Sequence, residues 1–387
     1  MKNLSHFYGA CMLALFIAAL FVSYCFLVIV LIIGWKLVEP GIRPDAIGNH
    51  VAVEVSVVVA ARNEAPRIRH LINDLRNQQF ANFEVIIIDD HSEDGTTDVC
   101  VAAVAGDDRF KVVQARGIGK KAALTQAIEL ARGTIILTTD ADCRIGPFWV
   151  RTMCAMLAQP SVMFCFGCVA ISSSNLFGKM QALEFAALVG SSAATAALGA
   201  PTMCNGANLA YRKRAFEGVN GYVGNEAIAS GDDEFLMRKI LKAFPGSVCC
   251  CTNRDALVRT SAAVNAMEFI RQRLRWAGKW KSNSSLISRL LAVYVFCFHG
   301  AVVLLPVLVA MGIVPVVGLY CLLFKAFAEL YLFILWRPIM SISRSWSAFL
   351  LLQLIHSPYV VFVAITSQFV SFEWKGRRIN GLAISDR

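Results

Sequence analysis

The sequence is poor in charged residues, and this shortage limits what the protein can be. Charged side chains make up 17% of the 387 residues and hydrophobic ones 57%, against roughly 25% and 45–50% in soluble proteins. The shortage is uneven, because residues 10–33 carry no charge at all whereas residues 51–285 have ordinary polarity. An ordinary soluble protein is therefore excluded, and the length allows two or three domains.

The charge-free segment 10–33 predicts a transmembrane helix. As a helix it would be about 36 Å long, enough to cross a bilayer core of about 30 Å. A cleaved signal peptide is the alternative, but its apolar part is typically about 7–15 residues long. Here the apolar run ends in Gly34-Trp35-Lys36 without a small-x-small cleavage pattern, which favours an uncleaved anchor.

Two further apolar stretches, 290–336 and 348–372, lie near the carboxyl end. The first is long enough for two crossings, interrupted at Gly312 and Pro315. We therefore predict an N-terminal transmembrane anchor, a polar domain, and a C-terminal region of about three membrane segments with a basic tail. The corresponding ranges are 1–40, 51–285 and 286–387.

The sequence lacks the pattern of a nucleic-acid-binding protein despite a net charge of +10. Its basic residues are not interleaved with an aromatic stacking platform. Many of them instead precede the second apolar stretch: Arg271, Arg273, Arg275, Lys279, Lys281 and Arg289. The positive-inside rule then places the polar domain in the cytoplasm, and we expect a multi-pass protein of a bacterial inner membrane, surrounded by membrane lipids.

The thirteen cysteines show no paired spacing that would indicate a disulfide framework or a zinc site. Cys165 and Cys168 form a C-x-x-C without a second pair, whereas structural zinc sites combine two such pairs or a pair of histidines. Reduced thiols that pack in the interior are the better interpretation.

The polar domain alternates strand-like and helix-like segments. Apolar, β-branched segments occupy 53–64, 83–92, 110–115 and 133–143, and helical patterns occupy 66–78 and 121–131. This alternation predicts a doubly wound α/β sheet. Ligands bind at the carboxyl ends of such strands, and polar clusters follow three of them.

Asp140-Ala141-Asp142 follows the last of these strands. Alternation along an extended chain would place both carboxylates on one side, where hard oxygen ligands suit Mg²⁺ or Mn²⁺ and the metal can neutralise a diphosphate leaving group. The alternative is a solvated turn, in which aspartate is common.

Asp89 and Asp90 end the second strand and could hydrogen-bond a ribose or a base edge. Capping of the following helix is an equally ordinary role for an acid at this position. Lys120 and Lys121 follow a glycine turn and could reach phosphate oxygens as point charges. A solvated helix start would account for both lysines as well.

Gly231-Asp232-Asp233-Glu234 precedes an amphipathic helical pattern. Acids in the first turn suit the helix dipole, which is a sufficient structural explanation. Adjacent like charges also raise the pKa of one member of such a group, as a general base for a sugar hydroxyl requires.

Gln272, Arg275 and Trp276 share one helical face because they lie at positions i, i+3 and i+4. An amide, a guanidinium and an indole on one face would suit hydroxyls, a phosphate and a stacked sugar ring. A juxtamembrane helix with basic residues and an interfacial tryptophan is the alternative.

The ordered set of these motifs resembles the inverting family 2 glycosyltransferases of the GT-A fold. The motifs are ARNE (61–64), DDHS (89–92), DAD (140–142), GDDE (231–234) and QRLRW (272–276). The resemblance covers about residues 51–285 and is greatest to the membrane-bound branch with cellulose, chitin and hyaluronan synthases and ceramide glucosyltransferases. It implies a Rossmann-like nucleotide-sugar-binding domain inserted between the N-terminal helix and the C-terminal helical region.

The resemblance also implies roles for individual residues. Asp233 would be the general base with Asp232 beside it, Asp89 would bind the nucleoside, and Asp142 would bind the metal with help from Asp140. The donor site would comprise Arg62, Glu64, Asp89, Asp90, Lys120 and Asp140. The acceptor and diphosphate end would comprise Asn205, Gly206, Asn208, Gln272, Arg275 and Trp276.

Two departures from the family pattern concern the base and the nucleoside. GDDE differs from the T-E-D of cellulose synthases, so Asp232 stays an alternative to Asp233. Arg62 stands where many relatives have an aromatic residue, which argues against a stacked base at that position.

The predicted reaction is a single displacement with inversion, from a nucleotide-sugar, expected to be a UDP-sugar, to a lipid-linked or other membrane-associated acceptor. A processive polysaccharide synthase that extends a glycan acceptor is the first alternative, although few crossings leave little room for a polymer channel. A non-catalytic membrane scaffold is the second, and a transporter, suggested only by Lys325 and Glu329, is the third.

Polar residues within the apolar regions raise separate expectations. Lys325 and Glu329 are four residues apart and are expected to form an internal ion pair. One amino-terminal and three carboxyl-terminal crossings would place the basic tail outside, against the positive-inside rule, so one segment is expected to be re-entrant or interfacial. Residues 176–198, rich in Ala and Leu, are expected to lie on the membrane.

Overall fold

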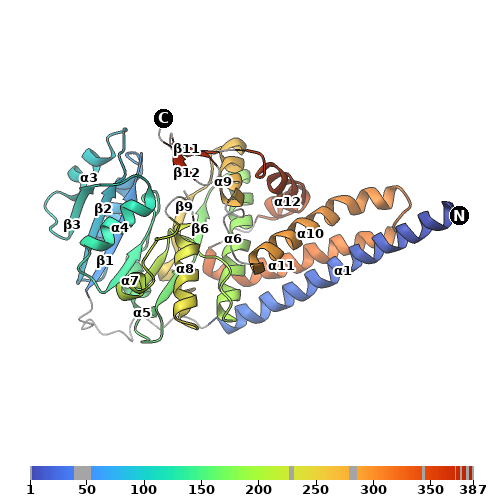
Figure 1. The fold of residues 1–387 in the computed structure, drawn as a ribbon, viewed down its shortest axis with the longest axis horizontal. Helices are drawn as coiled ribbons and strands as arrows, with labels where there is room; N and C mark the ends of the chain where they lie inside the picture. The colour runs from blue at the N-terminus through green and yellow to red at the C-terminus, as the bar shows by residue number, and fades with distance from the viewer. Residues whose placement is uncertain are drawn as a thin grey trace.

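The computed structural model describes residues 2–38, 54–225, 231–278, 286–341, 345–370, 372–374, 377–380 and 383–385. Side chains are described for these residues except 2–11, 287–288 and 372–385. Figure 1 shows an α/β part around a large sheet at one end and a bundle of long helices that reaches the N-terminus at the other. The expected contribution of Lys279 and Lys281 to the basic segment lies outside the described residues.

The large sheet has the strand order β3-β2-β1-β4-β7-β5-β8. Its first four strands in sequence, β1 to β4, are parallel, whereas β7 runs antiparallel to both β4 and β5. The strands are β1 (Val55–Ala61), β2 (Phe83–Asp89), β3 (Phe110–Gln114), β4 (Ile135–Thr138), β5 (Phe164–Gly167), β7 (Leu209–Arg212) and β8 (Val248–Cys251). The predicted α/β fold is confirmed, and the run of buried side chains in β1 and β2 explains their continuous apolar sequence, since buried parallel strands have both faces covered.

Helices cover both faces of this sheet. They are α2 (Ile68–Arg76), α3 (Thr96–Val104), α4 (Lys120–Leu130), α5 (Trp149–Met156), α7 (Lys213–Gly218) and α8 (Asp232–Ala243). α2 starts two residues after Pro66, which therefore does not occupy the predicted first helical position. The amides of Arg67 and Ile68 both donate to the Glu64 carbonyl, so a turn directly after β1 leads into the helix.

The described residues also form two smaller sheets. A parallel pair, β6 (Val169–Ser172) and β9 (Val258–Ser261), lies beside the large sheet. The chain ends in a three-stranded antiparallel sheet of β10 (Phe372–Trp374), β11 (Arg377–Asn380) and β12 (Ala383–Ser385).

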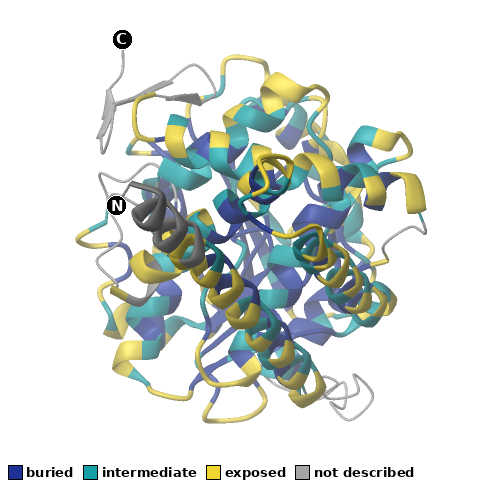
Figure 2. Cartoon of the chain, turned by 90° about the vertical axis from the view of Figure 1, so that its right-hand side faces the viewer, coloured by how far each residue is buried: buried dark blue, intermediate teal, exposed yellow. Residues whose placement is uncertain are grey.

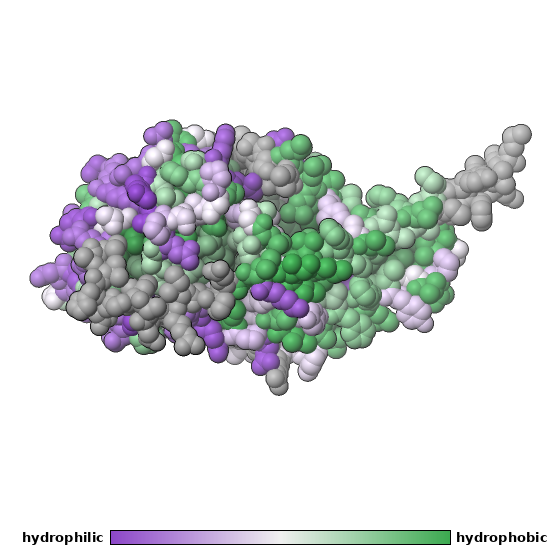
Figure 3. Space-filling view, turned by 90° about the horizontal axis from the view of Figure 1, so that it is seen from below, coloured by the Kyte–Doolittle hydropathy of each residue, from purple (hydrophilic) through white to green (hydrophobic). Residues whose placement is uncertain are grey.

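Within the described part of the chain, four helices are long and apolar enough to cross a membrane: α1 (Lys2–Leu37), α10 (Leu286–Ala310), α11 (Tyr320–Met340) and α12 (Trp346–Thr366). The predicted interruption of the second apolar stretch is confirmed, because α10 ends before Gly312, whose φ is +73°. Figure 3 shows the contrast between a hydrophilic α/β end and a hydrophobic surface over these helices. In Figure 2 exposed residues line the outer faces of the helices while buried ones lie between them.

Helix α6 (Leu176–Ala197) joins the two parts of the molecule. It contacts α1, α11 and α12 on the helical side and β6 and β8 on the sheet side. Small residues permit this packing: a Cβ on Gly34 would lie 2.4 Å from the Ala194 carbonyl oxygen, and one on Gly190 would lie 2.3 Å from the Trp336 ring. The expectation that residues 176–198 lie on the membrane surface is wrong, because protein covers this helix on several sides.

Candidate active site

A cavity of about 470 Å³ opens where the carboxyl ends of the central strands meet α6, α8 and the helix α9 (Ala266–Gly278). Most of the predicted site residues line it. They are Arg62, Glu64, Asp90, Lys120, Asp140, Asp142, Asn205, Gly206, Asp232, Asp233, Gln272, Arg275 and Trp276. Segments separated by more than two hundred residues thus meet in one space.

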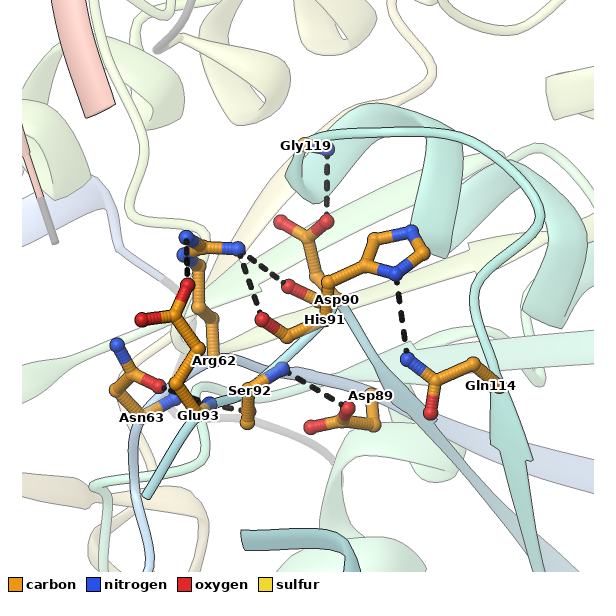
Figure 4. A network of polar contacts seen from close by, with 9 residues as sticks. All are labelled: Arg62, Asn63, Asp89, Asp90, His91, Ser92, Glu93, Gln114 and Gly119. Atoms are coloured by element: carbon orange, nitrogen blue, oxygen red, sulfur yellow. Dashed lines mark hydrogen bonds and ion pairs between the residues drawn. The ribbon is translucent and has the colours of Figure 1, made fainter. Parts of the chain in front are cut away.

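The loops after β1 and β2 form the rim of the cavity and hold each other by hydrogen bonds (Figure 4). Arg62 is buried and donates through Nη1 to the carbonyl oxygens of Asp90 and His91, at 2.8 and 3.1 Å. Asn63 and His91 have φ values of +50° and +55°, a conformation that costs free energy for residues other than glycine. The Arg62 bonds stabilise this tight pair of turns, and the Arg62 side chain lines the cavity as a cation rather than as an aromatic platform.

The two adjacent acids at the end of β2 have different positions. Asp90 lines the cavity, and its Oδ1 accepts the Gly119 amide at 2.9 Å (Figure 4). Asp89 is buried outside the cavity lining, and its Oδ2 accepts the Ser92 amide at 3.0 Å. The structure therefore brings Asp90, and not Asp89, to the site where the nucleoside was expected, because consecutive residues of a strand point to opposite faces.

Asp140 and Asp142 lie in a turn directly after β4, which ends at Thr138. The expectation of an extended chain through both acids is thus wrong, since the Cys143 amide bonds back to the Asp140 carbonyl at 3.1 Å. The turn nevertheless gathers ligand atoms of Asp140, Asp142 and Cys143 within 4.8 Å of one another. Burial and then the Asp140 charge raise the pKa of the Cys143 thiol, so it stays protonated and the two carboxylates are the hard ligands.

Lys120 lies between the acids that follow β4 and those of α8. Its Nζ is 2.7 Å from Asp140 Oδ1 and 3.3 Å from Asp232 Oδ2. Burial would lower the pKa of Lys120, but the carboxylates of Asp140 and Asp232 outweigh it and raise that pKa. Lys120 is therefore a fixed positive charge at the centre of the acidic end.

The acids of α8 lie in its first turn, after Gly231, whose φ is +83°. Asp233 Oδ2 accepts the Gly206 amide at 2.8 Å, and its Oδ1 accepts the Glu234 amide at 2.7 Å. These bonds fix the Asp233 carboxylate at the cavity edge. Glu234 also pairs with Arg238 at 2.7 Å, so it has an ordinary structural role within the helix.

The segment 205–208 divides between the cavity and the interior. Asn205 and Gly206 line the cavity, and a Cβ on Gly206 would lie 3.2 Å from Lys120 Nζ and 3.3 Å from Asp232 Oδ2. Asn208 is fully buried elsewhere. Its amide donates to the carbonyls of Cys168 and Ala256, and its oxygen accepts Trp149 Nε1, so every polar group of Asn208 is engaged in bracing the fold.

Gln272, Arg275 and Trp276 share the face of α9 that lines the cavity, as predicted from their spacing. Burial lowers the pKa of the Arg275 guanidinium, while the charges of Asp140, Asp232 and Asp233 act in the opposite direction. An arginine side chain is not deprotonated in proteins, so Arg275 is a cation that faces the acidic end.

An apolar wall completes the cavity, and sequence reasoning did not identify it. Phe185, Leu188 and Val189 of α6 line it together with Ile171 and Met203. The wall ends at Trp276, whose ring centroid is 6.0 Å from that of Phe185. The only signal in the sequence was the apolar character of residues 176–198, which we had assigned to the membrane surface.

The family model described as Glycosyl transferase family 2 matches residues 56–219. This range contains the loops after β1 and β2, with Arg62 and Asp90, and the turn with Asp140 and Asp142. It ends before α8 and α9. The acids of α8 and the QRLRW segment therefore lie outside the matched range.

Two curated relatives match over longer ranges. Beta-monoglucosyldiacylglycerol synthase of Trichormus variabilis is 29% identical over 231 residues, which cover 58% of this chain and 48% of that protein. An N-acetylglucosaminyltransferase of Rhizobium sp. (strain N33) is 24% identical over 261 residues, which cover 64% of this chain and 57% of that protein. The chain thus spans about half the length of these relatives.

The mannosyltransferase PcManGT from Pyrobaculum calidifontis, solved in complex with GDP-Man and Mn²⁺, has the same overall fold. The superposition covers 92% of this chain and 99% of that one with a TM-score of 0.60 and 18% sequence identity. At this identity the likeness concerns the fold alone, a mixed sheet with central parallel strands as in GT-A enzymes. The chain is thus similar to family 2 glycosyltransferases in the sequence of residues 56–219, and its fold agrees with that similarity.

Proposed function

We propose that the protein transfers a sugar, with inversion, from a UDP-sugar to a lipid-linked acceptor in the membrane. The observation that supports this most is the composition of one cavity. Its polar end combines the aspartates with Lys120 and Arg275. Its other wall is the apolar face of α6, which packs on α1, α11 and α12, three of the helices that are long and apolar enough to cross a membrane (the membrane-type helices). Such a cavity suits a polar donor and an acceptor with an apolar part.

Asp140 and Asp142 would hold a divalent cation, Mg²⁺ or Mn²⁺. Their carboxylates supply the oxygen donors that both ions prefer, and their ligand atoms are close enough together to share one ion. When bound, the cation would offset the negative charge that develops on the diphosphate. Arg275 and Lys120 add fixed positive charge at the same end, and guanidinium groups bind phosphate oxygens through paired hydrogen bonds.

Asp90 and Arg62 would bind the nucleoside part of the donor. Both line the cavity next to the glycine turn that leads into α4, and an acid at the end of an α/β strand is well placed to accept a hydrogen bond from a ribose or base. Asp89 is proposed instead as a brace for the loop after β2.

Asp233 would act as the general base. Its carboxylate accepts two amide hydrogen bonds, and a carboxylate has about four acceptor sites, so it can still take the acceptor hydroxyl proton. The hydroxyl oxygen then bonds to the anomeric carbon as the bond from that carbon to the diphosphate breaks. Attack opposite the leaving group inverts the anomeric centre. Asp232 is already engaged with Lys120, which favours Asp233 as the base.

The acceptor would lie along the apolar wall with its hydroxyl toward Asp233. Phe185, Leu188 and Val189 belong to the helix that contacts α1, α11 and α12, so an acyl or prenyl chain could approach from the membrane side. This route places the catalytic part at the bilayer surface. From the basic residues that precede α10, we place that surface on the cytoplasmic side of a bacterial inner membrane.

The test is a panel of UDP- and GDP-sugars incubated with purified protein, Mn²⁺ and a total lipid extract. Nucleotide release that requires both Mn²⁺ and lipid, with one sugar added per lipid by mass spectrometry, is the expected result. Release that is stimulated by a soluble glycan and not by lipid, with products of increasing length, would contradict the proposed acceptor class and indicate a polysaccharide synthase.

A further inference from the structure

A buried ion pair lies directly behind the cavity wall, between α6 and α9. Arg273 and Glu184 are only 4% and 8% exposed. Arg273 Nε donates to Glu184 Oε1 at 3.0 Å, and its Nη2 donates to Glu184 Oε2. Neither residue lines the cavity, yet Arg273 contacts Gln272 and Trp276, which do.

Arg273 contacts two other residues of the QRLRW segment, Gln272 and Trp276. Its Nη1 donates to Gln272 Oε1 at 2.6 Å. Since the oxygen of this amide is held by Arg273, the NH₂ end of Gln272 is the end presented to the cavity. The guanidinium also lies 4.3 Å from the centroid of the Trp276 ring, within the range of cation–π attraction.

The same pair is connected to the membrane-type helices. Tyr359 of α12 donates to Glu184 Oε1 at 3.4 Å, and its ring centroid is 5.3 Å from that of Phe269 on α9. Arg273 lies 4.5 Å from the Phe269 ring on the same helix. Residues of α6, α9 and α12 therefore meet around Arg273. This arginine contacts the cavity-lining residues Gln272 and Trp276 from outside the cavity.

Geometry distinguishes this pair from an ion pair that only stabilises the fold. The pair determines which end of the Gln272 amide faces the cavity, and an NH₂ donor suits phosphate or hydroxyl oxygens whereas an amide oxygen would repel a diphosphate. Arg273 also lies over one face of the Trp276 ring and restricts its rotation.

We propose that Glu184 and Arg273 are positioning residues that act on transfer through Gln272 and Trp276. This inference rests on the proposed function, because it assumes that Gln272 and Trp276 contact the diphosphate or the acceptor. Glu184 orients Arg273, and Arg273 fixes the Gln272 amide and the Trp276 ring before the substrates bind.

A double-mutant cycle of Glu184→Gln with Gln272→Ala tests the proposal, because residues that act through one another give non-additive effects. We expect Glu184→Gln alone to lower kcat by about tenfold or more, as loss of a hydrogen bond to a charged group does. In the Gln272→Ala background the same change should cost less than about twofold.

Glu329→Gln is the matched control, because Glu329 is also a paired glutamate in a helix, but its recorded partners Tyr24, Lys325 and Gln353 belong to α1, α11 and α12 rather than to α9. It should lower the thermal midpoint while kcat is unchanged. Equal fractional losses of kcat from Glu184→Gln in both backgrounds, or an unchanged kcat, would overturn the proposal. If Glu184→Gln does not purify, Tyr359→Phe replaces it in the same cycle with the same expected sign. A wild-type protein without transfer on any donor would contradict the proposed function instead.

Discussion

Two clusters of charged side chains lie in the two halves of the molecule, and they differ in how their charges are balanced. In the cavity Lys120 contacts Asp140 and Asp232, with Asp142 and Asp233 nearby, and the side chains of Lys120 and Asp140 are 24% and 36% exposed. Between the membrane-type helices Lys325 pairs with Glu329 at 2.8 Å and is 3% exposed.

The helical cluster is closed on itself. Glu329 accepts the Tyr24 hydroxyl at 2.6 Å and the Gln353 amide at 2.7 Å, and Lys325 donates to the Gln353 oxygen at 3.1 Å. The predicted internal ion pair is thus confirmed, and it joins α1, α11 and α12. The cavity cluster has an excess of acids and an open side, which is what a site for a cation and a phosphate group requires. The balanced charges of the helical cluster indicate a structural role, and the excess of acids in the cavity cluster indicates a role in binding or catalysis.

Asp233→Asn should give the largest effect of any single change in this comparison. It keeps the size of the side chain and one of its two amide hydrogen bonds, since the NH₂ group of asparagine cannot accept. It removes the base, and general-base catalysis is worth roughly 10²- to 10⁴-fold. Transfer should fall by that factor in a single-turnover assay, while Mn²⁺-dependent nucleotide affinity is retained. Asp232→Asn is the paired comparison: if it abolishes transfer and Asp233→Asn does not, the base assignment between the two is reversed.

Arg275→Lys should have the next largest effect. Lysine keeps the charge but replaces a fork of donors by one point charge, and hydrogen bonds to charged groups are worth about 1.5–3 kcal/mol. We expect kcat/KM for the donor to fall by about ten- to a hundredfold. Arg271→Lys, on an exposed position of the same helix, is the control and should be neutral. Full activity of Arg275→Lys would argue against a paired contact with phosphate.

Leu188→Gln should affect the acceptor alone. This change makes the apolar wall polar at a half-buried position, and burial of a leucine side chain is worth about 1.5–3 kcal/mol. KM for a lipid acceptor should rise by about tenfold or more, with KM for the donor unchanged. A rise in both constants would show that the wall belongs to the donor site.

Lys325→Met should leave the chemistry unchanged and lower only the stability. Removing one partner of a buried pair costs about 3–5 kcal/mol, whereas replacing both by apolar residues is often neutral. The thermal midpoint should therefore fall in Lys325→Met and recover in Lys325→Met/Glu329→Leu, with equal kcat for both proteins. Loss of transfer in the double variant would give this pair a functional role.

The sequence predicted those parts of the structure that depend on local patterns. The apolar strands and the break at Gly312 follow from local composition, and the shared face of Gln272, Arg275 and Trp276 follows from helical periodicity. A single segment contains each of these signals. The family resemblance assigned Asp89 and Asn208 to the site, but neither lines the cavity. Which of two neighbours faces a cavity depends on strand register and on distant partners such as Trp149.

The role of α6 was the main error, and its cause is physical. A helix rich in alanine and leucine packs equally well on lipid and on other helices, so composition alone does not identify its surroundings. The decisive features are Gly34 and Gly190, where the backbone of α6 approaches α1 and α11 too closely for a side chain. The sequence shows both glycines but not which helices they bring together.

The central claim is that Asp140 and Asp142 form one site for a cation and a nucleoside diphosphate together with Arg275, which is distant from them in sequence. Calorimetric titration of purified protein with UDP or GDP in the presence of Mn²⁺ tests it directly. We predict that the wild type binds one of these nucleotides, that EDTA abolishes the binding, and that Asp142→Asn and Arg275→Lys each weaken it by about tenfold or more. Nucleotide binding that persists in EDTA and is unchanged in both variants would contradict the account.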